Sequence, residues 1–250
     1  MSAPVVMVHG NPETEAVWDP LLAELHLDRT VRLSPPGFGA VLPAGFGATM
    51  PEYRDWLITQ LEAFEEPVDL VGHDWGAGHV MNAVMARPDL VRSWAVDGIA
   101  LFDPDYAWHP LARTWQDPVT GPDAVAALVG GTEEERTSVM LGFGIPQPVA
   151  RQLAAAQGEE MGRAILSLYR SALQPAMSDA GRHLEAAAAR PGLAVWATGD
   201  DLMGTEEMRR RSADRAGART AVLDGPGHWW MLQEPARAAR VLGDFWAGLP

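Results

Sequence analysis

The sequence of 250 residues contains no cysteine and no lysine, so all 19 of its basic residues are arginine. Without cysteine, the chain can form no disulfide and offers no thiolate to a metal ion. Without lysine, it has neither the amine of a Schiff-base enzyme nor the lysine of a phosphate-binding P-loop. The two absences exclude several classes of catalytic site.

Long apolar runs are also missing. The first residues, MSAPVVMVHGNPE, carry no basic start and only a five-residue apolar run, and no later segment approaches the length of a membrane span. A signal peptide has a basic start and a longer apolar region, and a spanning helix needs about 20 apolar residues. We therefore expect a cytoplasmic protein without a membrane partner.

Positive charge is scarce, since 33 acidic residues leave a net charge of −14. An acidic surface repels phosphate backbones and anionic lipids, so nucleic acid is not an expected partner. The one basic run, 209–211, lies beside Glu206 and Glu207 and indicates a solvated helix face. With 47% apolar residues, the chain is predicted to fold as one α/β domain, or as a domain with an insertion.

Short apolar runs alternate with longer amphipathic stretches. Each run is rich in β-branched or large apolar residues and ends at Gly, Asp, Pro or Ser, which is typical of buried parallel strands joined by helices. The predicted strands are 5–8, 31–33, 68–71, 94–96, 193–197 and 220–223. The predicted helices between them are 15–26, 51–65, 76–86, 204–216 and 230–247.

One region breaks this alternation. Residues 103–190 contain turns marked by proline and several helical patterns, but no convincing strand. A helical block of this length between two strands indicates an insertion that forms a lid over the sheet. We therefore expect a core made of residues 1–102 and 191–250, with about six parallel strands, and a helical lid at 103–190.

Polar motifs follow four of the predicted strands. They are HGNP at 9–12, GHDWG at 72–76, GDD at 199–201 and GPGH at 225–228. In open parallel sheets, ligands bind beyond the carboxyl ends of the strands, where these motifs converge. Two carboxylate sites and a histidine are therefore expected at one edge, in the chain order of a nucleophile, an acid and a base.

The GHDWG motif matches G-x-nucleophile-x-G, the nucleophile elbow of the α/β-hydrolase fold, with aspartate in place of serine. The chain resembles the epoxide hydrolase and haloalkane dehalogenase branch, since HGNP, GHDWG, the acid turn, GHWW and the helical lid come in family order. The resemblance implies a cofactor-free, metal-free hydrolase with Asp74 as its nucleophile. The two antiparallel strands that usually precede HG are absent here, so the strand after HG is expected at the edge of the sheet.

The chemistry of Asp74 points the same way. A carboxylate that attacked an ester would give an anhydride, which is a poor intermediate. Attack on a saturated carbon with a leaving group instead gives an alkyl ester, which a histidine-activated water can cleave. Asp74 as nucleophile therefore indicates epoxides or alkyl halides, whereas the alternative reading is an Asx turn among its glycine neighbours.

His228 is the candidate base, because it alone of seven histidines lies in a glycine-rich loop after the last strand. His73 flanks the nucleophile, but strand alternation predicts that it points away. Asp200 follows Pro191 by nine residues, a spacing often seen in the family, and is our choice for the third triad member. Its alternatives are Asp201 and, because one dehalogenase subgroup uses that strand end, Asp97.

The resemblance also implies an oxyanion hole made by the backbone N–H groups of Asn11 and Trp75. In one dehalogenase subgroup, the side chains at these two positions bind the departing halide. Epoxide hydrolases usually carry a large apolar residue at the position of Asn11. Asn11 therefore favours a halide, while Trp75 is common to both families.

The predicted lid favours an epoxide instead. The stretch SLYR, with Tyr169, resembles the N-W-Y-R stretch that carries a proton-donating tyrosine in epoxide hydrolases. WQDP at 115–118 resembles the F-Q-x-P stretch near the first lid tyrosine, but that tyrosine itself falls near Leu111, so Tyr106, Trp108 or His109 is expected to substitute. The residues expected to line the substrate pocket are Phe102, Trp108, His109 and Trp115.

The sequence thus predicts a hydrolase that opens an epoxide to a vicinal diol, with a small apolar electrophile and water as its partners. The first alternative is a haloalkane dehalogenase that uses Asn11 and Trp75 as halide donors. The second is a catalytically retired α/β-hydrolase fold that binds a small ligand.

Overall fold

The computed structural model describes residues 3–249, which form a six-stranded, wholly parallel sheet. The strand order is β2-β1-β3-β4-β5-β6, so β2, the strand after the HGNP loop, lies at the edge as expected. This sheet confirms the predicted fold class. The strands are β1 (Val5–Val8), β2 (Thr30–Leu33), β3 (Val68–Gly72), β4 (Val91–Val96), β5 (Gly192–Ala197) and β6 (Arg219–Leu223).

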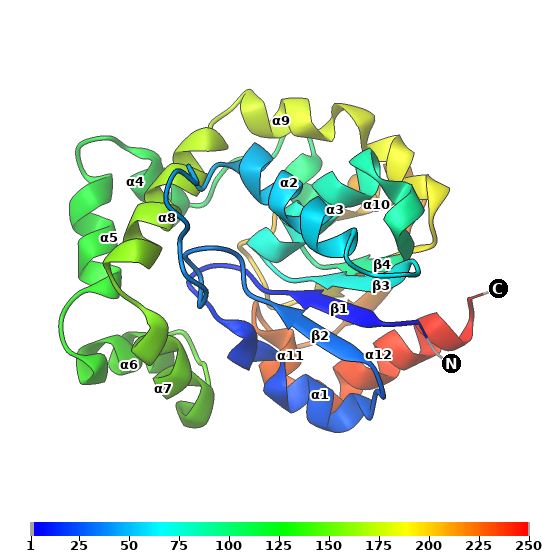
Figure 1. The fold of residues 1–250 in the computed structure, drawn as a ribbon, viewed down its shortest axis with the longest axis horizontal. Helices are drawn as coiled ribbons and strands as arrows, with labels where there is room; N and C mark the ends of the chain where they lie inside the picture. Colours follow the sequence, from blue (N-terminus) through cyan, green and yellow to red (C-terminus); the bar gives the residue numbers. More distant parts are fainter. Residues whose placement is uncertain (1–2, 250) are drawn as a thin grey trace.

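Helices cover both faces of the sheet (Figure 1). One face carries α2 (Met50–Leu61), α3 (Trp75–Ala86) and α10 (Glu206–Arg215), and the other carries α1 (Asp19–Leu25), α11 (Trp230–Gln233) and α12 (Pro235–Ala247). The prediction of one helix over 230–247 is wrong, because the chain leaves the helical conformation at Glu234 (φ −135°, ψ 54°) and Pro235 starts a new helix. A proline lacks the N–H that would continue the preceding helix.

Between β4 and β5 the described chain contains only helices, all within the segment expected to be a lid or just before it. Figure 1 shows α4 to α8 together on one side of the sheet, whereas α9 and η4 run above α3. None of the helices within residues 3–249 is long and apolar enough to cross a membrane. These elements are η3 (Ile99–Phe102), α4 (Pro110–Gln116), α5 (Gly121–Val129), α6 (Glu133–Gly142), α7 (Gln147–Ala156), α8 (Glu159–Ser171), α9 (Ala176–Ala180) and η4 (Gly181–Ala189).

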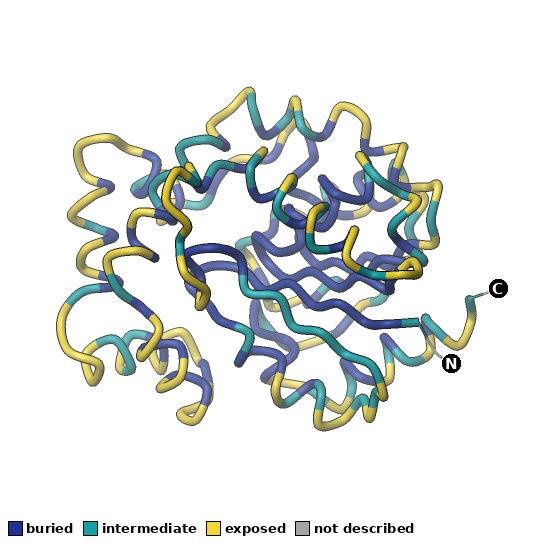
Figure 2. The backbone as a smooth tube through the Cα atoms, in the orientation of Figure 1, coloured by how far each residue is buried: buried dark blue, intermediate teal, exposed yellow. Residues whose placement is uncertain are grey.

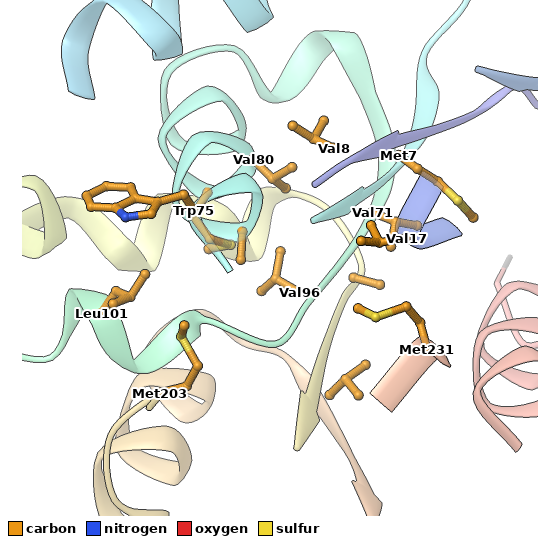
Figure 3. Close-up of a cluster of buried hydrophobic side chains, with 14 of the residues drawn as sticks. Met7, Val8, Val17, Val71, Trp75, Val80, Val96, Leu101, Met203 and Met231 are labelled. Atoms are coloured by element: carbon orange, nitrogen blue, oxygen red, sulfur yellow. The ribbon is translucent and has the colours of Figure 1, made fainter. Parts of the chain in front are cut away.

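The core lies on both sides of the central strands, which are buried along their length (Figure 2). Because helices cover both faces, β1 and β3 need apolar side chains at almost every position. Helix α3 is buried from Trp75 to Val84. Figure 3 shows Val8 of β1 and Val96 of β4 near Val80 of this helix, whereas Met7 and Val71 lie beside Val17. This packing fixes the point where β3 turns into α3.

Candidate active site

Asp74 occupies the turn between β3 and α3 in an unusual backbone conformation (φ 52°, ψ −124°). Glycines on either side permit this bend. A Cβ added to Gly76 would lie 2.1 Å from the carbonyl oxygen of Val8, so only glycine lets α3 approach β1 this closely. Such a conformation costs on the order of 1–3 kcal/mol and persists only where the surroundings enforce it.

The carboxylate of Asp74 is buried, with 6% of the residue exposed. Its Oδ1 accepts a hydrogen bond of 2.8 Å from the backbone N–H of Asn11. A Cβ added to Gly10 would lie 2.2 Å from the same oxygen, which explains the glycine of the HGNP loop. The other oxygen, Oδ2, lies 3.6 Å from Nε2 of His228, so one carboxylate oxygen is held by the backbone and the other faces the imidazole.

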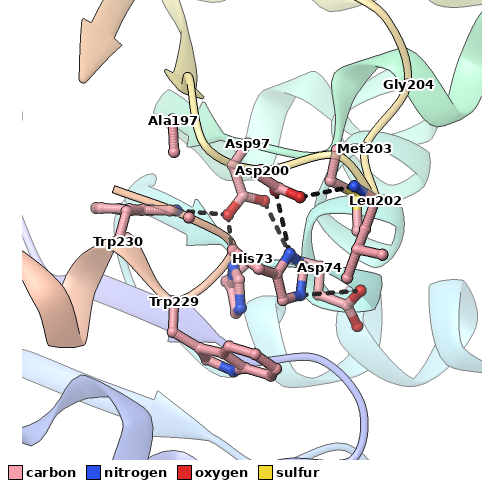
Figure 4. Close-up of polar contacts among 12 residues, drawn as sticks. His73, Asp74, Asp97, Ala197, Asp200, Leu202, Met203, Gly204, Trp229 and Trp230 are labelled. Carbon is pink, nitrogen blue, oxygen red and sulfur yellow. Dashed lines mark hydrogen bonds and ion pairs between the residues drawn. The ribbon is translucent and has the colours of Figure 1, made fainter. Parts of the chain in front are cut away.

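Asp200 lies on the far side of the same imidazole. Its Oδ2 is 3.1 Å from Nδ1 of His228, and its Oδ1 accepts 2.9 Å from the backbone N–H of Leu202 (Figure 4). Asp201 is exposed. Asp97 accepts 3.0 Å from the backbone N–H of Asp74 rather than contacting His228. Of the three candidate acids, the structure brings Asp200 to the histidine.

Burial and pairing separate the pKa values of the two carboxyl groups. Burial raises the pKa of Asp74 to about 6, although the positive charge of His228 opposes this shift. Burial also acts on Asp200, but the hydrogen bond and charge of His228 outweigh it and lower its pKa to about 2. Burial lowers the pKa of His228, yet its bond to Asp200 and the nearby negative charges leave that pKa above the ordinary value.

Tyr169, on α8, is buried beside this site. Its hydroxyl oxygen accepts 3.3 Å from the side-chain amide of Asn11, the residue whose backbone holds Asp74. Burial and the negative charge of Asp74 raise the pKa of Tyr169 well above its ordinary value, so the phenol keeps its proton at neutral pH. Its ring is enclosed by the indoles of Trp75, Trp108 and Trp115, with centroids 5.3, 5.4 and 4.9 Å away.

The proposed substitutes for a second lid tyrosine are all engaged with the backbone. The hydroxyl of Tyr106 donates to the carbonyl of Leu202 at 3.1 Å, and the indole N–H of Trp108 donates to that of Ala172 at 3.1 Å. Nδ1 of His109 accepts from the N–H of Ala112 at 3.2 Å, which caps α4.

The predicted pocket residues fall into two groups. Trp108 and Trp115 contact Tyr169, as described above, and Trp75 stacks on Trp108 with centroids 5.4 Å apart. Phe102 is fully buried in η3, and within residues 3–249 no ring contact joins it to Trp75 or Tyr169. A substrate-binding role stays a prediction for Phe102 and equally for Trp108, His109 and Trp115.

A second buried network lies behind Asp74 and His228 and was not predicted. His73 is bonded through Nδ1 to Oδ2 of Asp97 at 2.5 Å and through Nε2 to Oε1 of Glu13 at 3.0 Å. Burial lowers the pKa of His73, but these two carboxylates raise it well above the ordinary value. The ring of His73 turns away from the carboxylate of Asp74, yet its centroid lies 4.6 Å from that of His228.

Two neighbouring tryptophans complete this network. The indole N–H of Trp229 donates to Oε1 of Glu13 at 2.6 Å. The indole N–H of Trp230 donates to Oδ2 of Asp97 at 2.6 Å, as Figure 4 shows. The position of Glu13, three residues after Gly10 in the HGNP loop, was the signal that could have indicated a role near the site.

Glu13, His73 and His228 bring potential ligand atoms within 4.8 Å of one another. Glu13 and Asp97 already occupy both nitrogens of His73, and Asp200 occupies Nδ1 of His228. This arrangement fits a hydrogen-bond network better than a metal centre, because a metal ligand needs a free lone pair.

The family model of the alpha/beta hydrolase family matches residues 5–241, whereas no curated protein matches the sequence. A loop variant of the haloalkane dehalogenase DbeA from Bradyrhizobium elkanii is similar in structure, with 18% identity, a TM-score of 0.77, and coverage of 99% of this chain and 90% of that one. Epoxide hydrolase A from Mycobacterium thermoresistibile has 21% identity and a TM-score of 0.73, over 100% and 92% of the two chains.

E-2-(acetamidomethylene)succinate hydrolase is similar as well, with 20% identity, a TM-score of 0.72, and coverage of 98% and 91% of the two chains. At these identities the likenesses support the fold, and the different activities of the three proteins leave the reaction to the residues of the site. Together with the match over residues 5–241, the parallel sheet and the elbow at Asp74 show that this chain belongs to the alpha/beta hydrolase family.

Proposed function

We propose that this hydrolase opens an epoxide to a vicinal diol through an alkyl ester on Asp74. The observation that carries the proposal is the position of Tyr169, a protonated phenol joined through Asn11 to the nucleophile. A departing alkoxide is a very poor leaving group unless a hydroxyl donates a proton to it. Tyr169 supplies such a donor beside a carboxylate that suits attack on saturated carbon.

In the first step, Oδ2 of Asp74 forms a bond to a ring carbon, and the bond between that carbon and the epoxide oxygen breaks. The electron pair stays on the oxygen, which takes the proton of Tyr169. The amide of Asn11 donates to the phenol oxygen and therefore stabilises the phenolate that forms. General acid assistance of this kind contributes about 10²–10⁴-fold to the rate.

In the second step, His228 takes a proton from water, and the oxygen of that water attacks the carbonyl carbon of the ester. Asp200 orients the imidazole and stabilises the imidazolium. The backbone N–H groups of Asn11 and Trp75 hold the oxyanion, since the first N–H groups of a helix such as α3 lack intrahelical partners. Of the two protons of the water, one ends on the departing diol oxygen and one restores Tyr169.

The second candidate is a haloalkane dehalogenase, which Asn11 and Trp75 favour. In the structure, however, the amide N–H that would bind a halide donates to the oxygen of Tyr169. A halide needs donors but no proton, so a phenol at this place has a clearer use with an epoxide. The contacts of Asp74 and Asp200 with His228 argue against a catalytically retired protein.

The covalent mechanism is tested with the His228→Ala variant, which lacks the base for ester hydrolysis. After incubation with styrene-type or aliphatic epoxides and with bromoalkanes, intact mass spectrometry is expected to show one adduct, and peptide mapping is expected to place it on Asp74. The mass identifies the electrophile. A protein that only binds ligands would give no adduct with any of them.

Tyr169→Phe separates the two reactions. We expect epoxide alkylation to slow by about 10²–10⁴-fold, while any bromoalkane activity is barely affected. The matched control is Tyr53→Phe, since Tyr53 is equally buried but donates to the carbonyl of Pro36. If Tyr169→Phe turned over epoxides normally and Asn11→Ala abolished halide release, the dehalogenase would replace the epoxide hydrolase as the function.

A further inference from the structure

The turn that joins α6 to α7 carries an aromatic ring at the surface. Phe143 follows directly after α6 and is 37% exposed. Its ring stacks on the indole of Trp229, with centroids 5.7 Å apart and an angle of 20° between the planes. The hairpin formed by α6 and α7 thus packs on the loop that holds the catalytic histidine, although the two are far apart in sequence.

Trp229 in turn lies against His228. Their ring centroids are 4.9 Å apart in an edge-to-face arrangement, and Trp229 is 8% exposed. The indole is also fixed by its hydrogen bond to Glu13. On this side, two stacked rings, one of them on the surface, separate the catalytic imidazole from solvent.

The α6–α7 turn is loosely packed around Phe143. A Cβ added to Gly142 or Gly144 would have no atom within 4 Å, and Leu141 is 43% exposed. Within the hairpin, Nε of Arg136 donates to the carbonyl of Ala154 at 2.9 Å, so the two helices are tied to each other. The turn can therefore move locally when the contact between Phe143 and Trp229 opens, while Gln157 after α7 stays bonded to the carbonyl of Pro12.

The opposite wall of the site is closed more firmly. Trp75, Trp108, Trp115 and Tyr169 are all buried and contact one another through their rings. The indole of Trp108 is also tied to the backbone at Ala172. Opening this wall would break a cluster of four buried rings, whereas the stack of Phe143 on Trp229 is partly exposed.

We propose that substrate reaches Asp74, and product leaves, between the α6–α7 turn and Trp229, and that Phe143 sets the size of molecule that passes. The inference goes beyond the proposed function and applies to an epoxide and to an alkyl halide alike. It assigns a specificity-determining role to a residue outside the site itself.

The first test compares Phe143→Ala with Leu141→Ala, a control in the last turn of α6 without an aromatic contact. One aromatic stack corresponds to about a threefold to tenfold change in rate. We expect kcat/KM to rise by this factor for the widest electrophiles of a series and to stay unchanged for the smallest. An equal change for every size, or the same rise in Leu141→Ala, would contradict a size-selecting role.

The second test uses the absence of cysteine, which makes an introduced thiol unique. Phe143→Cys and Leu141→Cys are each measured before and after labelling with a bulky maleimide, so every protein is its own folding control. Labelling at position 143 is expected to lower kcat/KM at least about tenfold, and labelling at 141 is expected to have little effect.

If the labelled Phe143→Cys protein keeps the activity of its unlabelled form, the route lies elsewhere. This outcome is independent of the identity of the leaving group, which the Tyr169→Phe comparison tests. A failure of the epoxide assignment would leave the effect of the label unchanged, provided that the electrophile which alkylates Asp74 is used.

Discussion

Asp74 and Asp200 flank one imidazole, yet their pKa values move in opposite directions from the ordinary 3.8. That of Asp74 rises to about 6, chiefly through burial. That of Asp200 falls to about 2, because the bond and charge of His228 outweigh its burial. The ionised form of one carboxylate is therefore unfavourable in the folded protein, and that of the other is favourable.

One pKa unit corresponds to about 1.4 kcal/mol, so a rise of about two units makes the ionised Asp74 cost roughly 3 kcal/mol at pH 7. Asp74→Asn removes the charge while it keeps the side-chain shape and the backbone of the elbow. We expect the free energy of unfolding to increase by roughly 1–3 kcal/mol at pH 7. Because the folded state binds the proton of Asp74 more tightly, wild-type stability from this group falls as the pH rises from about 4 to 6, and the gain in the variant shrinks below that range.

Asp200→Asn provides the matched control with the opposite sign. The stabilisation from its ionised form is fully present above its ordinary pKa of 3.8 and is lost as the pH falls towards 2. At pH 7 we therefore expect this variant to lose roughly 2 kcal/mol. Both substitutions change an aspartate that contacts His228 into asparagine. The two variants therefore differ only in the environment of the carboxylate that is removed.

Urea denaturation of both variants and of the wild type at pH 7 and pH 4.5 measures these effects. The expected result is a stabilised Asp74→Asn variant whose advantage is smaller at the lower pH, and a destabilised Asp200→Asn variant. If Asp74→Asn were destabilised at pH 7, or if its gain did not depend on pH, burial of the charge would not be the main influence on the stability of ionised Asp74.

Three further outcomes are expected. Asp200→Asn is expected to slow ester hydrolysis far more than alkylation. A rapid-quench experiment with mass spectrometry is therefore expected to detect accumulated alkyl-enzyme. If the alkyl-enzyme accumulated in Asp201→Asn or Asp97→Asn instead, that residue would be the acid of the triad. The single-turnover rate of alkylation in the wild type is expected to fall about tenfold per pH unit below about pH 6, because the protonated carboxyl group of Asp74 is not a nucleophile. A rate unchanged down to pH 4 would contradict the raised pKa of Asp74. Gly76→Ala is expected to destabilise the protein by more than about 3 kcal/mol, since the new Cβ would overlap the carbonyl oxygen of Val8. The control Gly243→Ala in α12, which has open space around it, is expected to be neutral or slightly stabilising. Thermal denaturation measures both effects.

The sheet could be predicted from sequence because its central strands are buried on both faces. Such strands appear as unbroken apolar runs, and each run found in the sequence became a strand whose ends lie within three residues of the expected ends. The break between α11 and α12 was missed, although Pro235 marks it. The amphipathic pattern continues across this proline. Such a pattern depends on side chains alone, so it does not show that a backbone N–H is missing.

The candidate site was partly predictable for a similar reason. Asp74, Asp200 and His228 each lie just after a strand, so strand prediction alone brings them to one edge of the sheet. The network of His73 depends instead on contacts that strand positions do not fix. Trp229 and Glu13, for example, are 216 residues apart in the chain, and their contact follows from the exact course of two loops.

The stacked pair of Trp75 and Trp108 also gives the molecule a built-in optical reporter. Trp75 begins α3, Trp108 precedes α4, and their rings lie 5.4 Å apart at 25°. Two indole chromophores at this distance couple their electronic transitions, which produces a paired band in the far-ultraviolet circular dichroism spectrum, where the strongest indole transition lies. The intensity of that band registers the separation of α4 from the sheet without any dye, and replacing either indole by phenylalanine identifies the band.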